Sequence, residues 1–344
     1  MDSPKFGEHL AVSLTSRCPL RCDHCISESG PEKHLHTDLG ADVVSRFLES
    51  LRSMPTKPWL VTFTGGEAAL FPSILRDATE QLSAMGVRSA LMTSGYWAKS
   101  KQAAIRFIGR LGPLDHITIS TDTEHLRFVP FQWVVNAVEA SQECSIDVGV
   151  RVTIAEDVNE EDSKIVASCK AAFGDLVDIK HFVPWGRAKN FDRAQKQVTA
   201  GQTRIQTLPC PSDGAHVLES GDVIPCCSTI VASPLQHSLC LGNIHNESYS
   251  NIAERADSNP LLLYIRLFGF GPIIDAANNV GIPAENTDPN PCHFCAEFLE
   301  DKPLSVFAEK WVRSRLNIAK ICAALKAADS SRVDFSAIIR HAAN

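Results

Sequence analysis

No run of about 18 consecutive apolar residues occurs among the 344 residues, so the sequence offers no membrane-spanning helix. The first nine residues, MDSPKFGEH, also lack the apolar stretch of a secretory signal peptide. No basic stripe is present: 33 Lys and Arg stand against 40 Asp and Glu, which gives a net charge of −7. The positive charge that would neutralise phosphates is therefore missing. We expect a cytoplasmic protein whose partners include neither a membrane nor a nucleic acid.

The sequence does contain enough apolar residues for a large core and an unusual number of cysteines. With 44% hydrophobic and 21% charged residues, it fits one large domain with an appendage. Several of its twelve cysteines are separated by only two or three residues. In a reducing compartment such spacing indicates metal ligands rather than disulfides.

Short apolar runs alternate with longer amphipathic ones through the first half of the chain. This pattern predicts repeated βα units around a parallel sheet, hence an α/β fold. A helix is expected over residues 43–51, where apolar side chains recur at helical spacing. In such folds, ligands bind at the loops that follow the strands. We expect six strands, at residues 10–14, 59–63, 89–92, 116–120, 146–154 and 177–182.

The first cysteine cluster directly follows the first predicted strand. Cys18, Cys22 and Cys25 have the spacing C-x3-C-x2-C. Three thiolates do not complete a closed tetrahedral zinc site, and iron–sulfur clusters normally take four cysteine ligands. Three in one loop therefore favour a cluster with one iron open to another ligand. The alternative is a zinc site that combines Cys22 and Cys25 with Cys292 and Cys295.

Polar or glycine residues follow the next predicted strands. The second is followed by Gly65-Gly66-Glu67, in which the glycines allow a close approach of the backbone. Ser94 and Ser120 stand at the ends of the third and fourth strands, and Arg151 lies on the fifth. Just after the fourth strand, Glu124 and His125 either face a substrate or form a solvated pair on a loop.

A second group of cysteines lies in the later part of the chain. Cys210, Cys226 and Cys227 surround a predicted hairpin, and Cys292-His-Phe-Cys295 follows after a helical insertion. Because adjacent residues of an extended segment point to opposite faces, Cys226 and Cys227 are expected to face different surroundings. We interpret Cys144, Cys169, Cys240 and Cys322 as structural.

The cysteine loop and the Gly-Gly-Glu turn resemble the radical S-adenosylmethionine (SAM) superfamily, whose three-cysteine loop follows the first strand of a partial (β/α)6 barrel. The resemblance implies a 4Fe-4S cluster on Cys18, Cys22 and Cys25, with SAM on its open iron. Glu67 would hold the SAM ammonium beside Gly65 and Gly66. His24, in a position that is usually aromatic, would lie near the adenine. The implied contacts with the SAM ribose or carboxylate are Ser94, Ser120 and Arg151.

The second cysteine group resembles the shortened SPASM domain called twitch. That resemblance implies an auxiliary 4Fe-4S cluster on Cys210, Cys226, Cys292 and Cys295, although Cys226 and Cys227 could exchange roles. The expected domains are an N-terminal extension (1–9), a radical SAM barrel (10–195), a twitch- or SPASM-like domain (196–300) and C-terminal helices (301–344).

The chain as a whole resembles the radical SAM peptide epimerases of the epipeptide type. The shared segments are residues 16–25, 94–97, 119–125, 225–227, 261–269 and 292–295. The resemblance implies that a 5'-deoxyadenosyl radical abstracts a Cα hydrogen and that the Cys227 thiol returns one to the opposite face. The alternative for Cys227 is a small buried hydrophobe.

Other activities and partners stay open in the sequence. The aminoglycoside epimerases look similar in plan, and a radical SAM enzyme that cross-links peptides is a further alternative. The substrate would accordingly be a peptide or an aminoglycoside-type small molecule. Flavodoxin or ferredoxin would serve as reductant, and the auxiliary cluster would help to reduce the cysteine thiyl.

Overall fold

The structure of this protein is a computed structural model, and it divides into two compact units. The barrel unit comprises residues 9–199 and 217–221, and the helical unit comprises residues 1–8, 200–216 and 222–344. The residues that the structure describes are 7–34, 38–155, 157–181, 185–190, 209–210, 212, 214–226, 230, 237–285, 291–327 and 338.

The barrel unit contains a parallel sheet whose strands stand in chain order. Each strand from β1 to β6 pairs in parallel with the next. The predicted α/β fold and its six parallel strands are thereby confirmed, although the predicted residue 182 lies outside the described part of the chain. The strands are β1 (His9–Ser13), β2 (Leu60–Thr64), β3 (Arg88–Thr93), β4 (His116–Thr121), β5 (Asp147–Ile154) and β6 (Val177–His181).

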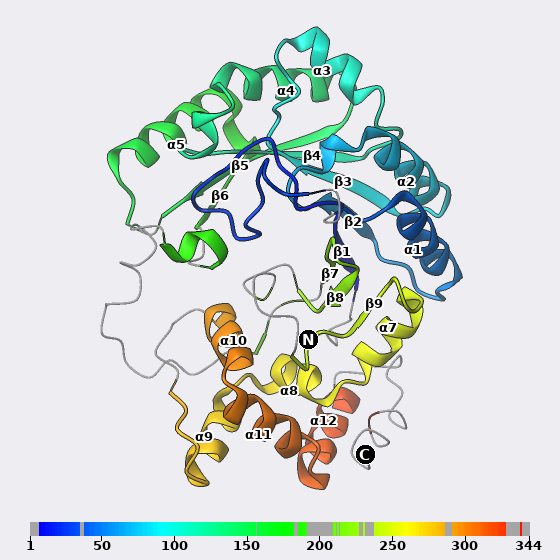
Figure 1. Cartoon of the computed structure of the whole chain (residues 1–344), viewed down its shortest axis with the longest axis vertical. Helices are drawn as coiled ribbons and strands as arrows, with labels where there is room; N and C mark the ends of the chain where they lie inside the picture. Colours follow the sequence, from blue (N-terminus) through cyan, green and yellow to red (C-terminus); the bar gives the residue numbers. More distant parts are fainter. Residues whose placement is uncertain are drawn as a thin grey trace. The chain divides into compact units, whose positions relative to one another are not determined.

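Helices α1 to α5 cover the outer side of this sheet (Figure 1). In α1, the buried residues Val43, Val44, Phe47, Leu48 and Leu51 form the stripe that the sequence predicted. Side-chain caps fix the start of two others: Ser100 accepts a hydrogen bond from the Ala103 amide in α3, and Asn159 accepts one from Asp162 in α5. The helices are α1 (Ala41–Ser53), α2 (Pro72–Ala84), α3 (Lys101–Ile108), α4 (Phe131–Glu143) and α5 (Glu160–Phe173).

The strands differ sharply between their two faces. In β4, Ile117, Ile119 and Thr121 are buried, whereas the alternating residues are half-buried. β5 repeats this alternation, with Val148, Val150, Val152 and Ile154 buried. The apolar face packs under the helices, and the opposite face carries polar side chains. Short 3-10 turns follow three of the strands, namely η2 (Ala68–Leu70), η3 (His125–Arg127) and η5 (Gly186–Asn190), and a further one, η4 (Gly174–Leu176), joins α5 to β6.

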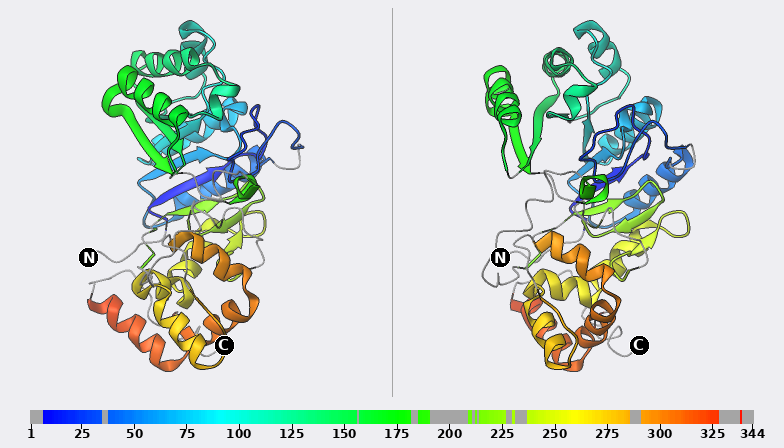
Figure 2. Two further views of the ribbon diagram at one scale, coloured as in Figure 1. Left: turned by 90° about the vertical axis from the view of Figure 1, so that its left-hand side faces the viewer. Right: turned by 60° about the vertical axis from the view of Figure 1, so that its left-hand side comes forward.

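The helical unit packs around α8 (Pro260–Phe268), of which seven residues are buried. Tyr264 lies edge-on to Trp311 of α11, with ring centroids 5.2 Å apart. Phe270 packs against Phe294 and Phe298 of α10 at 5.0 Å each. Figure 2 shows these helices, yellow to red, gathered into one body. The elements are β7 (Ala215–Val217), β8 (Asp222–Ile224), β9 (Gly242–Asn243), α7 (Tyr249–Asp257), α8, α9 (Gly271–Asn279), α10 (Pro291–Glu300), α11 (Lys302–Val312) and α12 (Arg315–Ala327).

None of the described helices alone is long and apolar enough to cross a bilayer. Only α8 and α9 together reach the required length and composition, and they are bent by 110° at the break between them.

Candidate functional site

The loop after β1 brings Cys18, Cys22 and Cys25 together. Burial raises the pKa of the Cys18 thiol to about 12, and the neighbouring Glu67 carboxylate and Cys25 thiol contribute to that rise. Burial also raises the pKa of Cys22, with contributions from Asp122, Cys25 and Cys18. Three thiolates in one loop would repel one another, and a cationic metal group among them removes that cost. This donor set therefore fits a metal cluster held by three thiolates.

The Gly65-Gly66-Glu67 turn supports the beginning of this loop. The Gly66 amide donates to the Thr15 carbonyl oxygen at 2.6 Å, and the Glu67 amide donates to that of Arg17 at 2.9 Å. A Cβ atom on Gly65 or Gly66 would overlap these same two carbonyl oxygens. Gly65 also has a φ of +114°, which favours glycine. The glycines thus let the turn and the cysteine loop touch, backbone against backbone.

Glu67 and Ser94, both predicted to contact SAM, are bonded to each other. One carboxylate oxygen of Glu67 accepts the Ser94 hydroxyl at 2.6 Å and the Ser94 amide at 2.9 Å. The other accepts the Ala69 amide at 3.2 Å. Burial raises the pKa of Glu67, and the two bonds from Ser94 oppose that rise. The role of Glu67 in holding the SAM ammonium stays a prediction.

Ser94, Ser120 and Arg151 lie at one level across neighbouring strands. Ser120 pairs with Arg151 of β5, and Ser94 directly follows Thr93, which pairs with Ile119. Arg151 in turn pairs with Asp178 of β6, whose carboxylate accepts from its Nε at 3.1 Å and from its Nη2 at 2.8 Å. The predicted SAM contacts thus form a row across the sheet. Asp178, which no sequence pattern had indicated, extends this row by binding Arg151.

His24 binds a buried aspartate at the end of β4. Its Nε2 lies 2.9 Å from Asp122 Oδ2, and the same oxygen lies 2.8 Å from His125 Nδ1. Burial raises the pKa of Asp122, but the adjacent His125 and His24 outweigh it, so the net shift is downward. Burial lowers the pKa of His125, and Asp122 outweighs this effect, so the net shift is upward. The edge of the His24 ring is therefore engaged, while the predicted contact with adenine stays a prediction.

Glu124 and His125 were expected to face a substrate or to form a solvated pair, and the structure gives them other partners. His125 binds Asp122 as described. Glu124 Oε2 accepts the backbone amide of Asp23, inside the cysteine loop, at 3.3 Å and the Arg127 guanidinium at 2.6 Å. Glu124 therefore ties the β4 loop to the cysteine loop, whereas the bond of His125 stays within the β4 loop.

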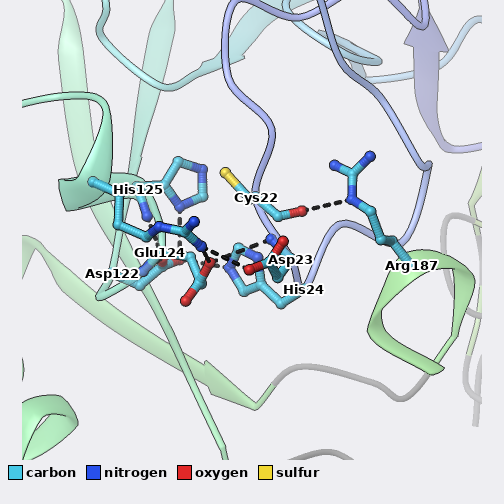
Figure 3. Close-up of polar contacts among 8 residues, drawn as sticks. Cys22, Asp23, His24, Asp122, Glu124, His125 and Arg187 are labelled. Atoms are coloured by element: carbon cyan, nitrogen blue, oxygen red, sulfur yellow. Dashed lines mark hydrogen bonds and ion pairs between the residues drawn. The ribbon is translucent and has the colours of Figure 1, made fainter. Parts of the chain in front are cut away.

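Arg187 holds the opposite side of the cysteine loop (Figure 3). Its Nε donates to the Cys22 carbonyl at 2.8 Å, and its Nη2 donates to that of Ser29 at 2.7 Å. Its backbone amide donates to the Cys25 carbonyl at 3.1 Å. A Cβ atom on Gly186, whose φ is +60°, would overlap the carbonyl of Ile26. No local sequence pattern indicates this role, because Arg187 is 165 residues from Cys22 and 158 residues from Ser29.

In the helical unit, the four cysteines assigned to the auxiliary cluster lie close together. Burial raises the pKa of Cys295 well above its ordinary value, and Cys226, Cys210 and Cys292 all contribute to that rise. Burial likewise raises the pKa of Cys210, against the opposing charge of Arg266. The Cys210 amide donates to the Ile265 carbonyl at 3.1 Å, which anchors Cys210 to α8. Cys227 lies outside the described residues.

Comparisons with known proteins agree with this arrangement. A model of the SPASM iron–sulfur cluster-binding domain matches residues 209–272. The chain is 24% identical over 276 residues to YydG of Bacillus subtilis (strain 168), which is described as a peptide biosynthesis protein; this covers 77% of this chain and 82% of YydG. It is also 33% identical over 123 residues to the GTP 3',8-cyclase of Streptomyces coelicolor, which covers 35% of this chain and 34% of that enzyme.

Solved structures share the fold. A structure of anSMEcpe with bound AdoMet has a TM-score of 0.56 at 13% identity, and the match covers 97% of this chain and 98% of that one. A structure of anSMEcpe with AdoMet and a peptide has a TM-score of 0.54 at 12% identity, covering 94% and 99%.

The chain thus shares its fold with anSMEcpe, and three cysteines directly follow its first strand. Residues 209–272 match the SPASM iron–sulfur cluster-binding domain. Both findings agree with the resemblance to radical SAM enzymes and with the cofactors predicted from it, SAM and 4Fe-4S clusters.

Proposed function

We propose that this chain is a radical SAM epimerase that inverts an L-amino-acid residue in a peptide natural-product precursor, with Cys227 as hydrogen donor. Two findings support the proposal. The chain is similar over 77% of its length to YydG, a protein described as acting in peptide biosynthesis. In addition, Cys226 lies with Cys210, Cys292 and Cys295, so the next cysteine along the chain is not needed as a cluster ligand.

The position of Cys226 is the observation that carries the proposal. Four thiolates satisfy one 4Fe-4S cluster. Cys226 follows β8 by only two residues, and neighbouring residues of an extended segment point in opposite directions. If Cys226 is the fourth ligand, the Cys227 thiol is not required by the cluster and is available as a hydrogen donor. A cross-linking enzyme would have no need for such a thiol.

The reaction balances with one hydrogen removed and one returned. Cys18, Cys22 and Cys25 would hold the cluster that, with SAM and one electron from a flavodoxin or ferredoxin, would supply a 5'-deoxyadenosyl radical able to take the hydrogen from the substrate Cα. The Cys227 S–H bond would then break, and its hydrogen would form the new Cα–H bond on the opposite face. The thiyl left on Cys227 would regain its thiol by taking up one proton and a second electron from the same reductant, passed on through the auxiliary cluster. Inversion requires abstractor and donor on opposite sides of one carbon.

Residues of the barrel unit would bind and orient the reactants. The row of Ser94, Ser120 and Arg151 would meet the polar groups of SAM, with the Arg151 guanidinium held in place by Asp178. Lys180 lies 3.1 Å from the other oxygen of Asp178. These side chains give the polar face of the sheet charges of both signs, which suit a zwitterionic ligand or a polar peptide backbone.

The test uses the Cys227→Ser variant and a candidate precursor peptide. Thiol protons exchange with water, so the wild type in D2O should give a product with one deuterium at the inverted carbon. The variant should still release deoxyadenosine but form no inverted residue. Cys144→Ser, which alters a thiol at the C-terminal end of α4, should behave as the wild type does. Inversion retained in Cys227→Ser, or a product without deuterium, would exclude the thiol as donor.

Iron analysis separates the donor role from a ligand role. Cys227→Ser should retain about eight irons per chain after reconstitution, whereas Cys226→Ser should fall to about four. The opposite result would exchange the roles of the two cysteines. If the wild type and Cys227→Ser both form a cross-linked product, the enzyme cross-links peptides and the epimerase proposal is wrong.

A further inference from the structure

The cysteine loop is bound to the end of β4 through one buried carboxylate. The Asp122 side chain is 1% exposed, the least of the three residues in this group. Its Oδ2 is shared between His24 and His125 at 2.9 and 2.8 Å. Its Oδ1 accepts the backbone amides of Glu124 at 3.0 Å and His125 at 2.9 Å. Both oxygens of Asp122 are therefore saturated, and one of the four contacts reaches into the cysteine loop.

We propose that Asp122 is a positioning residue for the SAM cluster: it fastens His24, and with it the segment from Cys22 to Cys25, to β4, and it holds a fixed negative charge beside the cluster ligands. Figure 3 shows Cys22 between this group and Arg187. His24 is adjacent to Cys25 and two residues after Cys22. Fixing its ring therefore restricts the backbone that carries both ligands.

Other contacts between the two loops are weaker. Arg127 Nη1 lies 2.7 Å from Asp23 and 2.6 Å from Glu124, but the Arg127 and Asp23 side chains are about half exposed. Exposed ion pairs contribute little, whereas a buried, fully bonded carboxylate fixes the geometry of its partners. Removing one partner of such a group leaves the others unsatisfied. Asp122 therefore makes the main buried contact between the β4 loop and the cysteine loop.

The charge of Asp122 has a second consequence. Reduction adds an electron to an iron–sulfur cluster, and a nearby negative charge opposes that addition. The carboxylate is one hydrogen bond away from His24, in the segment between Cys22 and Cys25, so its charge lies near these two ligands. Replacing it by a neutral amide of the same shape should make the SAM cluster easier to reduce.

His24, Asp122 and His125 also have the composition of a metal site, since their ligand atoms lie within 4.8 Å of one another. The distances of 2.8 and 2.9 Å are those of hydrogen bonds. A metal ion would have to displace both bonds, while Oδ1 stays bound to two amides. The hydrogen-bonded bridge accounts for every contact of Asp122 without an ion.

The decisive experiment is an EPR-monitored redox titration of the reconstituted enzyme. Asp122→Asn should raise the midpoint potential of the SAM cluster. Asp115→Asn is the matched control, because Asp115 also accepts a backbone amide, that of Ser89 at 2.7 Å, but lies ahead of β4 and is 39% exposed. The control should leave the potential unchanged. An Asp122→Asn enzyme with full iron content and the wild-type potential would overturn the charge effect.

A second measurement uses the metal-free chain, so that poor cluster incorporation does not obscure the result. Hydrogen exchange followed by mass spectrometry should show faster exchange over residues 18–28 in Asp122→Asn and in His24→Phe, with unchanged exchange in α1 and α2. The phenylalanine keeps a flat ring but loses the nitrogen that binds Asp122. Unchanged exchange in this loop would overturn the positioning role. If the wild-type chain binds one zinc ion and Asp122→Asn binds none, then His24, Asp122 and His125 form a metal site and not a hydrogen-bonded bridge.

Discussion

Arg187 makes a contact whose loss can be measured directly in the thiols that it protects. Its guanidinium donates to the carbonyls of Cys22 and Ser29 at 2.8 and 2.7 Å, and both of these residues are buried. Hydrogen bonds from a charged donor contribute about 1.5–3 kcal/mol each. Replacing Arg187 by methionine keeps an apolar stem but removes both bonds, so the closed loop should lose about 3–6 kcal/mol of stability.

Because a tenfold change corresponds to about 1.4 kcal/mol, this cost raises the opening equilibrium of the loop by roughly 100-fold or more. The assay is the rate at which a thiol reagent modifies Cys22 in the metal-free protein, followed by peptide mass spectrometry. Arg187→Lys keeps the charge, but one ammonium cannot reproduce a fork that reaches two carbonyls, so it should recover only a minor part of the protection. A labelling rate within about threefold of the wild type in Arg187→Met would refute this reasoning, given that the expected effect follows from two charged bonds.

Two further predictions concern a glycine and a histidine. Gly66→Ala should lower the iron content and the unfolding temperature, because its Cβ would overlap the Arg17 carbonyl; Gly109→Ala, which has room for a Cβ and a φ of −59°, should change neither in anaerobic thermal unfolding. His237 has a pKa lowered to about 4 by burial and by the charge of Lys302, so the unfolded chain binds more protons than the folded one below pH 6.5. The contribution of His237 to stability should be complete above pH 6.5 and be lost as the pH falls towards 4. Urea unfolding at several pH values should therefore show that the free energy of unfolding falls less steeply with acid in His237→Gln than in the wild type. Equal slopes of this free energy against pH would contradict the prediction.

Local patterns were sufficient for the sheet and for the grouping of the cysteines. The alternation of apolar residues in β4 and β5 follows from a sheet with one covered face, and the stripe of α1 follows from helical periodicity. The spacing of Cys18, Cys22 and Cys25, directly after an apolar run, predicts a loop of three metal ligands that follows a strand. These features depend on residues close together in the chain, so the sequence alone carries them.

The contacts that give the cysteine loop its shape could not be predicted in the same way. Asp122 is 98 residues from His24, and Arg187 is 165 residues from Cys22. Neither residue was singled out by the sequence patterns. Glu67 and Ser94 were each assigned to SAM, and only the structure shows that they bond to each other. Which polar groups meet depends on how the strands are brought side by side, and no local pattern encodes that.

The dependence of the cysteine loop on Arg187 also sets an order of events during protein synthesis. Chains emerge from the ribosome with their N-terminal end first, and Cys18 to Cys25 are among the earliest residues to appear. Their loop is closed on one side by the β2 turn and the β4 loop, but its other side is completed only when residue 187 has been made. A nascent chain that stops before η5 presents three thiols without the clamp over Cys22 and Ser29. Insertion of the cluster into a fully shaped site therefore follows translation of more than half of the chain.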